Sequence, residues 1–291
     1  MTLNPNNEQL DATASGKGIL YVVSTPIGNS EDITTRAVRM LRNCDLVVCE
    51  EAKEGAQLLR QNNLTKQIET LNEQNEVEKS IEILSLIKSG KNIALVSDCG
   101  TPVFADPGLT LVQMAIQNKI TVVPVPGASS IMAGLVASGF STNQFLYGGF
   151  LNRERSIRIE ELAALSREKR TVIILETPYR LMPILEAAAQ VMPDRNAYIG
   201  CNLTLPFETH HYGTFSELLD RFSEMKFKGE FIIVFEGANA TDADREIPVY
   251  IERGEYRSRG PRHFDDRRGS RFEDRPRRSE ERRVGKECRS R

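Results

Sequence analysis

The sequence predicts an α/β protein with two α/β domains, the first built on a parallel sheet that helices cover on both faces. Short continuous apolar runs alternate along the chain with segments whose apolar residues recur at helical spacing. Such runs are typical of strands buried on both faces of a sheet, as in parallel α/β folds. A length of 291 residues suffices for two modest domains, and no run approaches the roughly 18 apolar residues of a membrane helix.

The first half of the chain supplies four of the expected strands. They are Gly18–Val23, Leu46–Cys49, Ile93–Ser97 and Thr121–Val125. Helical spacing predicts helices over Ile33–Leu41, Ala52–Gln61, Val77–Ile87, Leu109–Ile116 and Ile131–Ala137. Because parallel strands end at the same edge of a sheet, the turns that follow these strands should cluster where open α/β sheets bind ligands.

Gly139 interrupts this pattern, and we place a domain boundary there. The second half is predicted to form strands Phe145–Phe150, Thr171–Leu175, Ala197–Leu203 and Phe231–Phe235, with helices Ser156–Leu165, Leu181–Met192 and Phe215–Phe222. The predicted domains are therefore residues 17–138 and 139–238, preceded by a disordered lead-in over residues 1–16 and followed by a disordered Arg-rich tail over residues 239–291.

The net charge of −2 hides an asymmetry between the body and this tail. Residues 253–291 hold 14 Arg and one Lys against eight acidic residues, so the rest of the chain is strongly acidic. Arg-Gly pairs and aromatic residues in the tail resemble Arg/Gly-rich RNA-binding segments, which predicts a salt-sensitive affinity for RNA.

Cysteine usage and the N-terminal sequence favour a cytoplasmic protein. The five cysteines are odd in number and mostly lie in apolar segments, as expected of reduced core thiols. The first residues contain no basic region followed by an apolar run, so no secretory signal is expected. No metal site is expected either, because Cys-x-x-Cys is absent and the adjacent His210 and His211 would point to opposite faces of a strand.

Three turns could carry the chemistry, because each follows a predicted strand and opens a helix. They are Thr25–Gly28, Ser97–Pro102 continuing to Gly108, and Pro126–Ser130. Glycine lets the backbone approach a ligand closely, and helix N-termini offer N–H donors to anionic groups. Taken singly, each is also an ordinary strand-to-helix turn with a capping residue. The standard dinucleotide, P-loop and G-x-S-x-G motifs are absent.

These residues resemble the tetrapyrrole methylase superfamily, and within it the branch of small-subunit rRNA (cytidine-2′-O)-methyltransferases. The stretches that carry the resemblance are Leu20–Asn29 with Asp32–Thr34, Ala94–Pro102 with Asp106–Gly108, Pro126–Ser130, Gly149–Leu151 and Lys228–Phe231. They occur in order across roughly residues 18–237.

The resemblance implies two α/β domains with S-adenosylmethionine in the cleft between them, in a homodimer. The residues expected to bind this cofactor are Pro26, Ile27, Gly28, Asp98, Gly100, Thr101, Pro102, Ser129, Ser130 and Glu176. The expected partner is ribosomal RNA or the small ribosomal subunit. No membrane partner is expected.

The chain departs from this branch on the substrate side. Cys49–Gly55 replaces an Ala-Glu-Asp-Thr-Arg-like stretch, and Cys201–Leu205 replaces an Arg-Glu-Leu-Thr-Lys-like stretch. A Glu-Ser-Pro-His-Arg-like stretch is present as Glu176–Arg180. The cofactor half of the pattern is therefore better preserved than the substrate half.

Methyl transfer from a sulfonium depends mainly on alignment, although a ribose hydroxyl must also lose a proton. Asp98 and Asp106 are the candidate catalytic bases by loop position, although each has a plain alternative as a cofactor ligand or a helix cap. The candidate RNA-binding residues are Arg153, Arg155, Arg158 and Arg180, because guanidinium groups bind phosphate and stack on bases. Interleaved glutamates leave open that the first three only form a solvated helix face.

Three functions stay open on the sequence alone. The leading one is an S-adenosylmethionine-dependent methyltransferase that 2′-O-methylates a cytidine ribose in small-subunit rRNA. The second is a methylase of a tetrapyrrole or another small molecule, which the acidic body favours because it would repel a polyanion. The third is a non-catalytic, cofactor-binding RNA partner.

Overall fold

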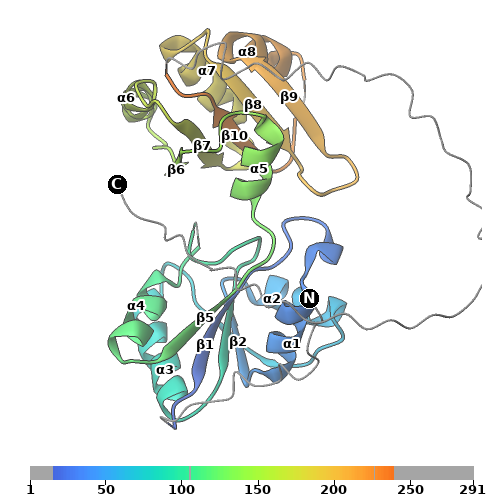
Figure 1. Ribbon diagram of the computed structural model, residues 1–291, viewed down its shortest axis with the longest axis vertical. Helices are drawn as coiled ribbons and strands as arrows, with labels where there is room; N and C mark the ends of the chain where they lie inside the picture. Colours follow the sequence, from blue (N-terminus) through green and yellow to red (C-terminus); the bar gives the residue numbers. More distant parts are fainter. Residues whose placement is uncertain (1–15, 105, 226, 239–291) are drawn as a thin grey trace, which may run out of the picture. The chain divides into compact units, whose positions relative to one another are not determined.

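The computed structural model describes residues 16–104, 106–225 and 227–238. Apart from Gly16, the predicted lead-in over residues 1–16 lies outside these residues, and so does the predicted tail over residues 239–291. The described residues form two five-stranded sheets, one in each half of the chain (Figure 1). Every helix among them is too short or too polar to cross a membrane.

The first sheet is entirely parallel and has the strand order β3-β2-β4-β1-β5. Its strands are β1 (Ile19–Val23), β2 (Leu46–Cys49), β3 (Gln67–Thr70), β4 (Ile93–Val96) and β5 (Thr121–Val125). The chain leaves β1 toward one side of the sheet and later crosses to β5 on the other side. This reversal creates the crevice in which open α/β sheets bind ligands, at the carboxyl ends of β1 and β4.

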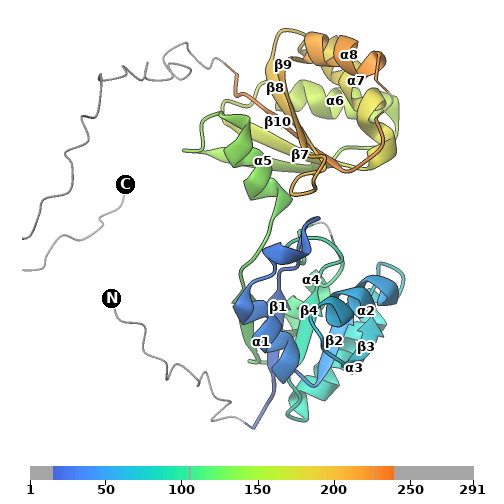
Figure 2. The same ribbon diagram turned by 90° about the vertical axis from the view of Figure 1, so that its right-hand side faces the viewer.

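Helices cover both faces of this sheet, as predicted (Figure 2). The helices are α1 (Thr35–Asn43), α2 (Ala52–Gln61), α3 (Glu76–Lys88) and α4 (Leu109–Gln117). Val47 packs in the cluster with residues of α1 and α2, whereas its neighbour Val48 packs in the cluster with residues of α3 and α4. This alternation explains the continuous apolar strands, since neighbouring side chains face opposite layers.

The second sheet is mixed and has the order β6-β7-β10-β8-β9. Its strands are β6 (Phe145–Phe150), β7 (Thr171–Glu176), β8 (Asn196–Cys201), β9 (Thr209–Thr214) and β10 (Phe231–Phe235). Only β6 and β7 pair in parallel. One face packs against α6 (Arg155–Leu165), α7 (Leu181–Val191) and α8 (Phe215–Ser223).

Helix α5 (Ser130–Ser138) covers the other face of the second sheet. Its Ile131 and Leu135 pack in one cluster with Ile232 of β10, and a Cβ on Gly134 would lie only 2.9 Å from Ile232. The helix therefore starts in a loop of the first sheet and packs on the second. The predicted boundary between residues 138 and 139 stays a prediction. Helix α5 lies before this boundary in the chain, although it packs on the second sheet.

Candidate functional site

Hydrogen bonds join the three predicted loops at the carboxyl edge of the first sheet. The Ser24 Oγ lies 3.0 Å from the Thr101 Oγ1, which joins the loop after β1 to the loop after β4. The Thr25 N–H donates to the Gly100 carbonyl at 2.8 Å. The Thr101 hydroxyl donates to the Ala128 carbonyl at 3.1 Å and so reaches the loop after β5. The expected clustering of these turns is thus present in the structure.

Two glycines allow this close approach of the loops. Gly100 has a φ of +86°, and a Cβ there would lie 3.1 Å from the Cγ2 of Ile27. A Cβ on Gly127 would lie 2.9 Å from the Cβ of Ser24. Larger residues would therefore separate the loops or strain the backbone.

Most of the predicted cofactor residues line two neighbouring hollows. Pro26, Ile27, Gly28 and Asp98 line one hollow, together with residues of α2. The other is lined by Gly100, Thr101, Ser129 and Ser130, with Phe104, Asp106, Ile131 and Leu175. Cys99 lines both.

Two residues of the predicted cofactor set line neither of these hollows. Pro102 is buried within its turn. Glu176 is buried at the end of β7 and forms an ion pair there.

The two candidate bases lie in the loop after β4 and differ in their partners. Asp98 accepts the Glu51 N–H at 3.3 Å, and Asp106 accepts a short hydrogen bond from the Ser97 hydroxyl. Burial raises the pKa of both carboxyl groups above the ordinary value of 3.8. The negative charge of Asp106 raises the pKa of Asp98 further. A carboxylate with a raised pKa is the stronger proton acceptor.

Glu50 is a third carboxyl group at this edge, which the sequence reasoning missed. It follows β2, and its pKa is raised by burial and then by the charges of Asp106 and Asp98. The signal for it was available, because Glu50 follows a predicted strand just as Ser24 and Asp98 do. This edge of the sheet is therefore acidic and suits a cationic group.

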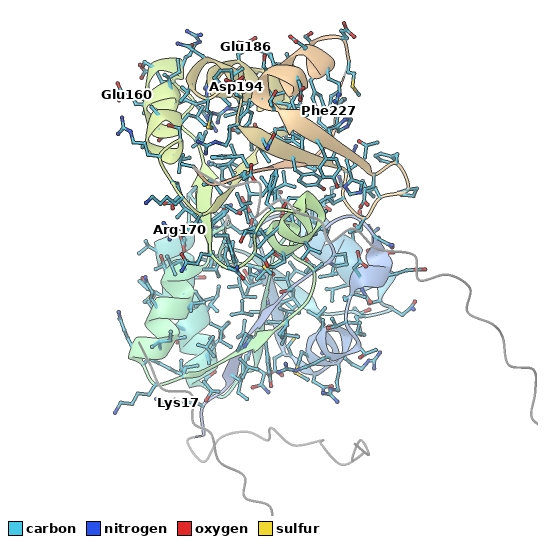
Figure 3. The ribbon with its side chains drawn as sticks, turned by 45° about the horizontal axis from the view of Figure 1, so that its top comes forward. Lys17, Glu160, Arg170, Glu186, Asp194 and Phe227 are labelled. Carbon is cyan, nitrogen blue, oxygen red and sulfur yellow. The ribbon has the colours of Figure 1, made fainter. Side chains whose placement is uncertain are left out.

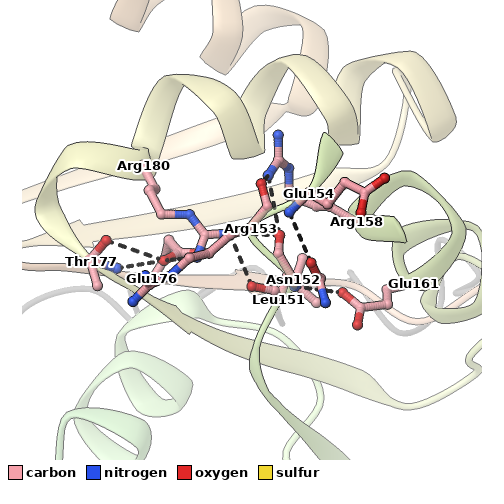
Figure 4. A network of polar contacts seen from close by, with 9 residues as sticks. All are labelled: Leu151, Asn152, Arg153, Glu154, Arg158, Glu161, Glu176, Thr177 and Arg180. Carbon is pink, nitrogen blue, oxygen red and sulfur yellow. Dashed lines mark hydrogen bonds and ion pairs between the residues drawn. The ribbon is translucent and has the colours of Figure 1, made fainter. Parts of the chain in front are cut away.

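Glu176 and Arg180 form a buried polar network on the second sheet (Figure 4). The Arg180 guanidinium lies 3.1 Å from Glu176 Oε1 and donates to the carbonyls of Leu151 at 3.0 Å and Asn152 at 2.8 Å. Among the described residues, Glu176 Oε2 has no hydrogen-bond partner. Three bonds hold the Arg180 side chain, which is 19% exposed, against the second half of the chain, and the RNA contact predicted for Arg180 stays a prediction.

The other three candidate RNA-binding arginines fall into two groups. Arg158 is buried and donates to the carbonyls of Asn152 and Arg153, at 3.2 and 3.0 Å, so it holds the start of α6 (Figure 4). Arg153 and Arg155 are exposed, and Arg155 bonds Gln190 at 3.1 Å.

The exposed surface of the neighbouring helices carries negative charge as well. Glu160 of α6 and Glu186 of α7 both lie at this surface (Figure 3). Of the four predicted arginines, Arg153 and Arg155 are thus the exposed ones, Arg180 is partly exposed and Arg158 is buried.

Comparison with known proteins places these loops in a family. The profile of the family described as Tetrapyrrole (Corrin/Porphyrin) Methylases matches residues 19–219. The chain belongs to the tetrapyrrole methylase family. The match covers all three loops and extends through β9 into α8.

Relatives in this family carry the name ribosomal RNA small subunit methyltransferase I. The one from Bacillus subtilis is 38% identical over 232 residues, which are 80% of each chain. The one from Escherichia coli O157:H7 is 36% identical over 240 residues, or 81% of this chain and 84% of the relative.

Solved structures of tetrapyrrole methylase-fold proteins share the fold at low sequence identity. A diphthine synthase matches 78% of this chain and 93% of its own, with a TM-score of 0.61 and 15% identity. A uroporphyrin-III C-methyltransferase from Thermus thermophilus, complexed with S-adenosylhomocysteine, covers 75% of this chain and 97% of its own, with a TM-score of 0.53 and 16% identity.

Proposed function

We propose that the protein is an S-adenosylmethionine-dependent methyltransferase that 2′-O-methylates a cytidine ribose in small-subunit ribosomal RNA. The observation that carries the proposal is the meeting of the loops after β1, β4 and β5 in one hydrogen-bonded edge. The names of the relatives support the RNA substrate.

The residues at this edge fit the proposed cofactor. Asp98, Asp106 and Glu50 supply negative charge for a cationic sulfonium and ammonium group. Helix α5 begins beside the second hollow, and the side chain of its N-cap residue Ser129 makes no capping hydrogen bond. The first N–H groups of α5 could therefore bind a carboxylate. Gly100 lines the second hollow without a side chain, which allows a ligand to approach its backbone closely.

The chemistry then requires little from the protein beyond alignment. Bound S-adenosylmethionine supplies a methyl group whose leaving group departs neutral. The loops hold the cofactor through Pro26–Gly28, Gly100–Thr101 and Ser129–Ser130, and they limit its orientations. Asp98 or Asp106 accepts the proton of the ribose hydroxyl, since the pKa of both carboxyl groups is raised.

The proposal includes a cytoplasmic homodimer. Three buried, unpaired cysteines, Cys44, Cys49 and Cys201, support a reducing compartment. Exposed apolar side chains of α5, Met132 and Val136, support contact with a second copy. Sedimentation of the purified protein would measure the oligomeric state.

A methylase of a tetrapyrrole or another small molecule is the second candidate. The acidic edge around Asp98 and Asp106 and the internal bonds of Arg158 and Arg180 favour it, because both reduce attraction for a polyanion. Methyl transfer to a porphyrin precursor, without transfer to RNA, would select this candidate. Cofactor binding without transfer to any RNA would instead indicate a non-catalytic RNA partner.

The deciding experiment supplies labelled S-adenosylmethionine and small ribosomal subunits from a strain that lacks this protein. Alkaline hydrolysis of the RNA follows. A 2′-O-methyl group removes the hydroxyl that attacks the neighbouring phosphate, so the label should survive in an uncleaved dinucleotide. Subunits from the parent strain are the matched control and should accept little label. Label in mononucleotides would place the methyl group on a base and contradict the ribose assignment.

A further inference from the structure

The turn that follows β8 has a strained backbone. Asn202 and Thr204 both have positive φ angles, of 52° and 70°. A β-branched residue such as Thr is rarely found in this left-handed region, because its branched side chain crowds the backbone. Strain of this kind persists only where surrounding contacts hold it, and it gathers at functional sites.

The strained turn packs against the loop after β1. The Asn29 N–H donates to the Thr204 hydroxyl at 3.0 Å. A Cβ on Gly28 would lie 2.9 Å from this hydroxyl oxygen and 3.0 Å from the Leu203 carbonyl oxygen. The turn of the second sheet and the Pro26–Asn29 loop of the first sheet are therefore in direct contact, and a larger residue at position 28 would push them apart.

A chain of hydrogen bonds fixes Thr204 to the core of the second sheet. The Thr204 N–H donates a short hydrogen bond to Glu208 Oε2, and the other oxygen of Glu208 lies 2.9 Å from His210 Nε2. The His210 Nδ1 lies 2.8 Å from the hydroxyl of Tyr198, which is fully buried under α5. The backbone of Thr204 is thus held by residues of β8, of β9 and of the turn between them.

We propose that Thr204 is a positioning residue that holds the Pro26–Asn29 loop in the shape that binds the cofactor. The proposal rests on the proposed function, since it takes this loop as part of the S-adenosylmethionine site. Thr204 lines neither hollow, and it acts through the Asn29 backbone. In this way the second half of the chain sets the affinity for S-adenosylmethionine of a loop that belongs to the first half.

The test compares three substitutions in the full chain. Thr204→Val removes the acceptor and keeps the branched shape, whereas Thr204→Ser keeps the acceptor. Thr209→Val is the matched control, because Thr209 is an exposed threonine of β9 whose side chain bonds His211 rather than the loop. Calorimetry with S-adenosylmethionine measures affinity, and amide hydrogen exchange of a peptide covering Asn29 measures how firmly the loop is held.

The expected results distinguish the effect of losing the hydrogen-bond acceptor from the effect of changing the shape of the side chain. Thr204→Val should weaken S-adenosylmethionine binding about tenfold, because the Asn29 N–H loses its partner. In the same variant without cofactor, the amide hydrogens of the peptide covering Asn29 should exchange about tenfold faster, because the Asn29 N–H has lost its hydrogen bond. Thr204→Ser and Thr209→Val should remain within about twofold of the wild type in both measurements. Exchange of the β10 peptide should stay unchanged, which shows that each variant is folded.

Three results would overturn the proposal. The first is wild-type affinity and exchange in Thr204→Val, and the second is an equal loss in Thr204→Ser, which would assign the effect to packing. In both cases cofactor binding by the wild type would leave the proposed function standing. The third is a wild-type protein that does not bind S-adenosylmethionine. This result would remove the proposed function and the cofactor role of Thr204, and faster exchange in Thr204→Val would then report only a structural contact.

Discussion

The Arg180 guanidinium lies 3.1 Å from Oε1 of Glu176, a carboxylate whose side chain is completely buried. Arg180 is the last residue of the 3-10 turn Pro178–Arg180, which follows β7 and turns Arg180 back toward Glu176. Arg180 also donates to the carbonyls of Leu151 and Asn152. The pair therefore fixes the start of the segment that leads to α6.

Replacing Arg180 should destabilise the protein strongly. Arg180→Met leaves the Glu176 carboxylate buried without its cation, and breaking such a buried pair costs about 3–5 kcal/mol of unfolding free energy. The double variant Glu176→Gln with Arg180→Met should recover part of this loss, because it removes the buried charge. Urea denaturation measures both values. Arg170→Met is the control, since Arg170 forms a more exposed ion pair with Glu168 and should change stability little. An equal loss in Arg170→Met would contradict the assignment.

Gly100 should be required for cofactor binding beyond its effect on stability. Gly100→Ala forces a Cβ into a left-handed backbone and toward Ile27, at 3.1 Å. Gly139→Ala imposes similar backbone strain at a φ of +73°, with nothing within 4 Å of the new Cβ. Each of these two variants should lose about 1–2 kcal/mol of unfolding free energy. Only Gly100→Ala should also weaken S-adenosylmethionine binding, by about tenfold or more if the loops separate. Equal affinities in calorimetry would show that the loop contact does not shape the site.

Asp98 should make stability depend on pH in a defined direction. Burial raises its pKa above 3.8, so the folded state holds its proton to higher pH than the unfolded state does. As pH rises from about 3.8 through the raised pKa, the unfolded state ionises first and stability falls.

The measurement for Asp98 is urea denaturation from pH 4 to 7. Asp98→Asn should flatten the fall in stability over this range, because it removes the titrating group. Glu160→Gln, on the exposed surface of α6, changes the net charge equally and is the control. Parallel curves for the wild type and Asp98→Asn would contradict the burial of this carboxylate.

Arg153 and Arg155 should account for a measurable part of any RNA affinity of the body. Both are exposed, and the double Ala variant should lower the slope of log K against log salt by about 1–2, because each phosphate contact releases roughly one counterion. Arg167→Ala with Arg170→Ala is the matched control, since it removes two arginines from the same half of the chain. Filter binding to small-subunit RNA at several salt concentrations measures the slopes. An identical slope in both double variants would remove Arg153 and Arg155 from the RNA interface.

The sequence predicts the apolar strands well, including the edge strands β5 and β6, and misses the two polar edge strands β3 and β9. The strands β1, β2, β4 and β10 are continuous apolar runs, and β7 contains one between Thr171 and Glu176; most of these residues are buried, which makes the strands visible in the sequence. The strand β3 reads Gln-Ile-Glu-Thr and β9 reads Thr-His-His-Tyr-Gly-Thr. Both lie at sheet edges and are partly exposed, so pairing with a neighbour, rather than their own composition, makes them strands.

The site is predictable where it follows strand ends and unpredictable where it depends on distant contacts. The three loops follow from the alternation of strands and helices, and the structure brings them together. Thr204 is 175 residues away from its partner Asn29, and no local pattern connects the two. The internal bonds of Arg158 and Arg180 were missed for a different reason, because their acceptors are backbone carbonyls, which no pattern of side chains reveals.

The strand order of the second sheet has a consequence for how the chain is made. The last strand, β10, lies in the middle of this sheet, between β7 and β8. A chain emerging from the ribosome can complete the first sheet once β5 has appeared, because all five of its strands precede α5. The second sheet must wait for residues 231–235, and until then β7 and β8 have unpaired edges. Helix α5, which packs on β8 and β10, must wait with them.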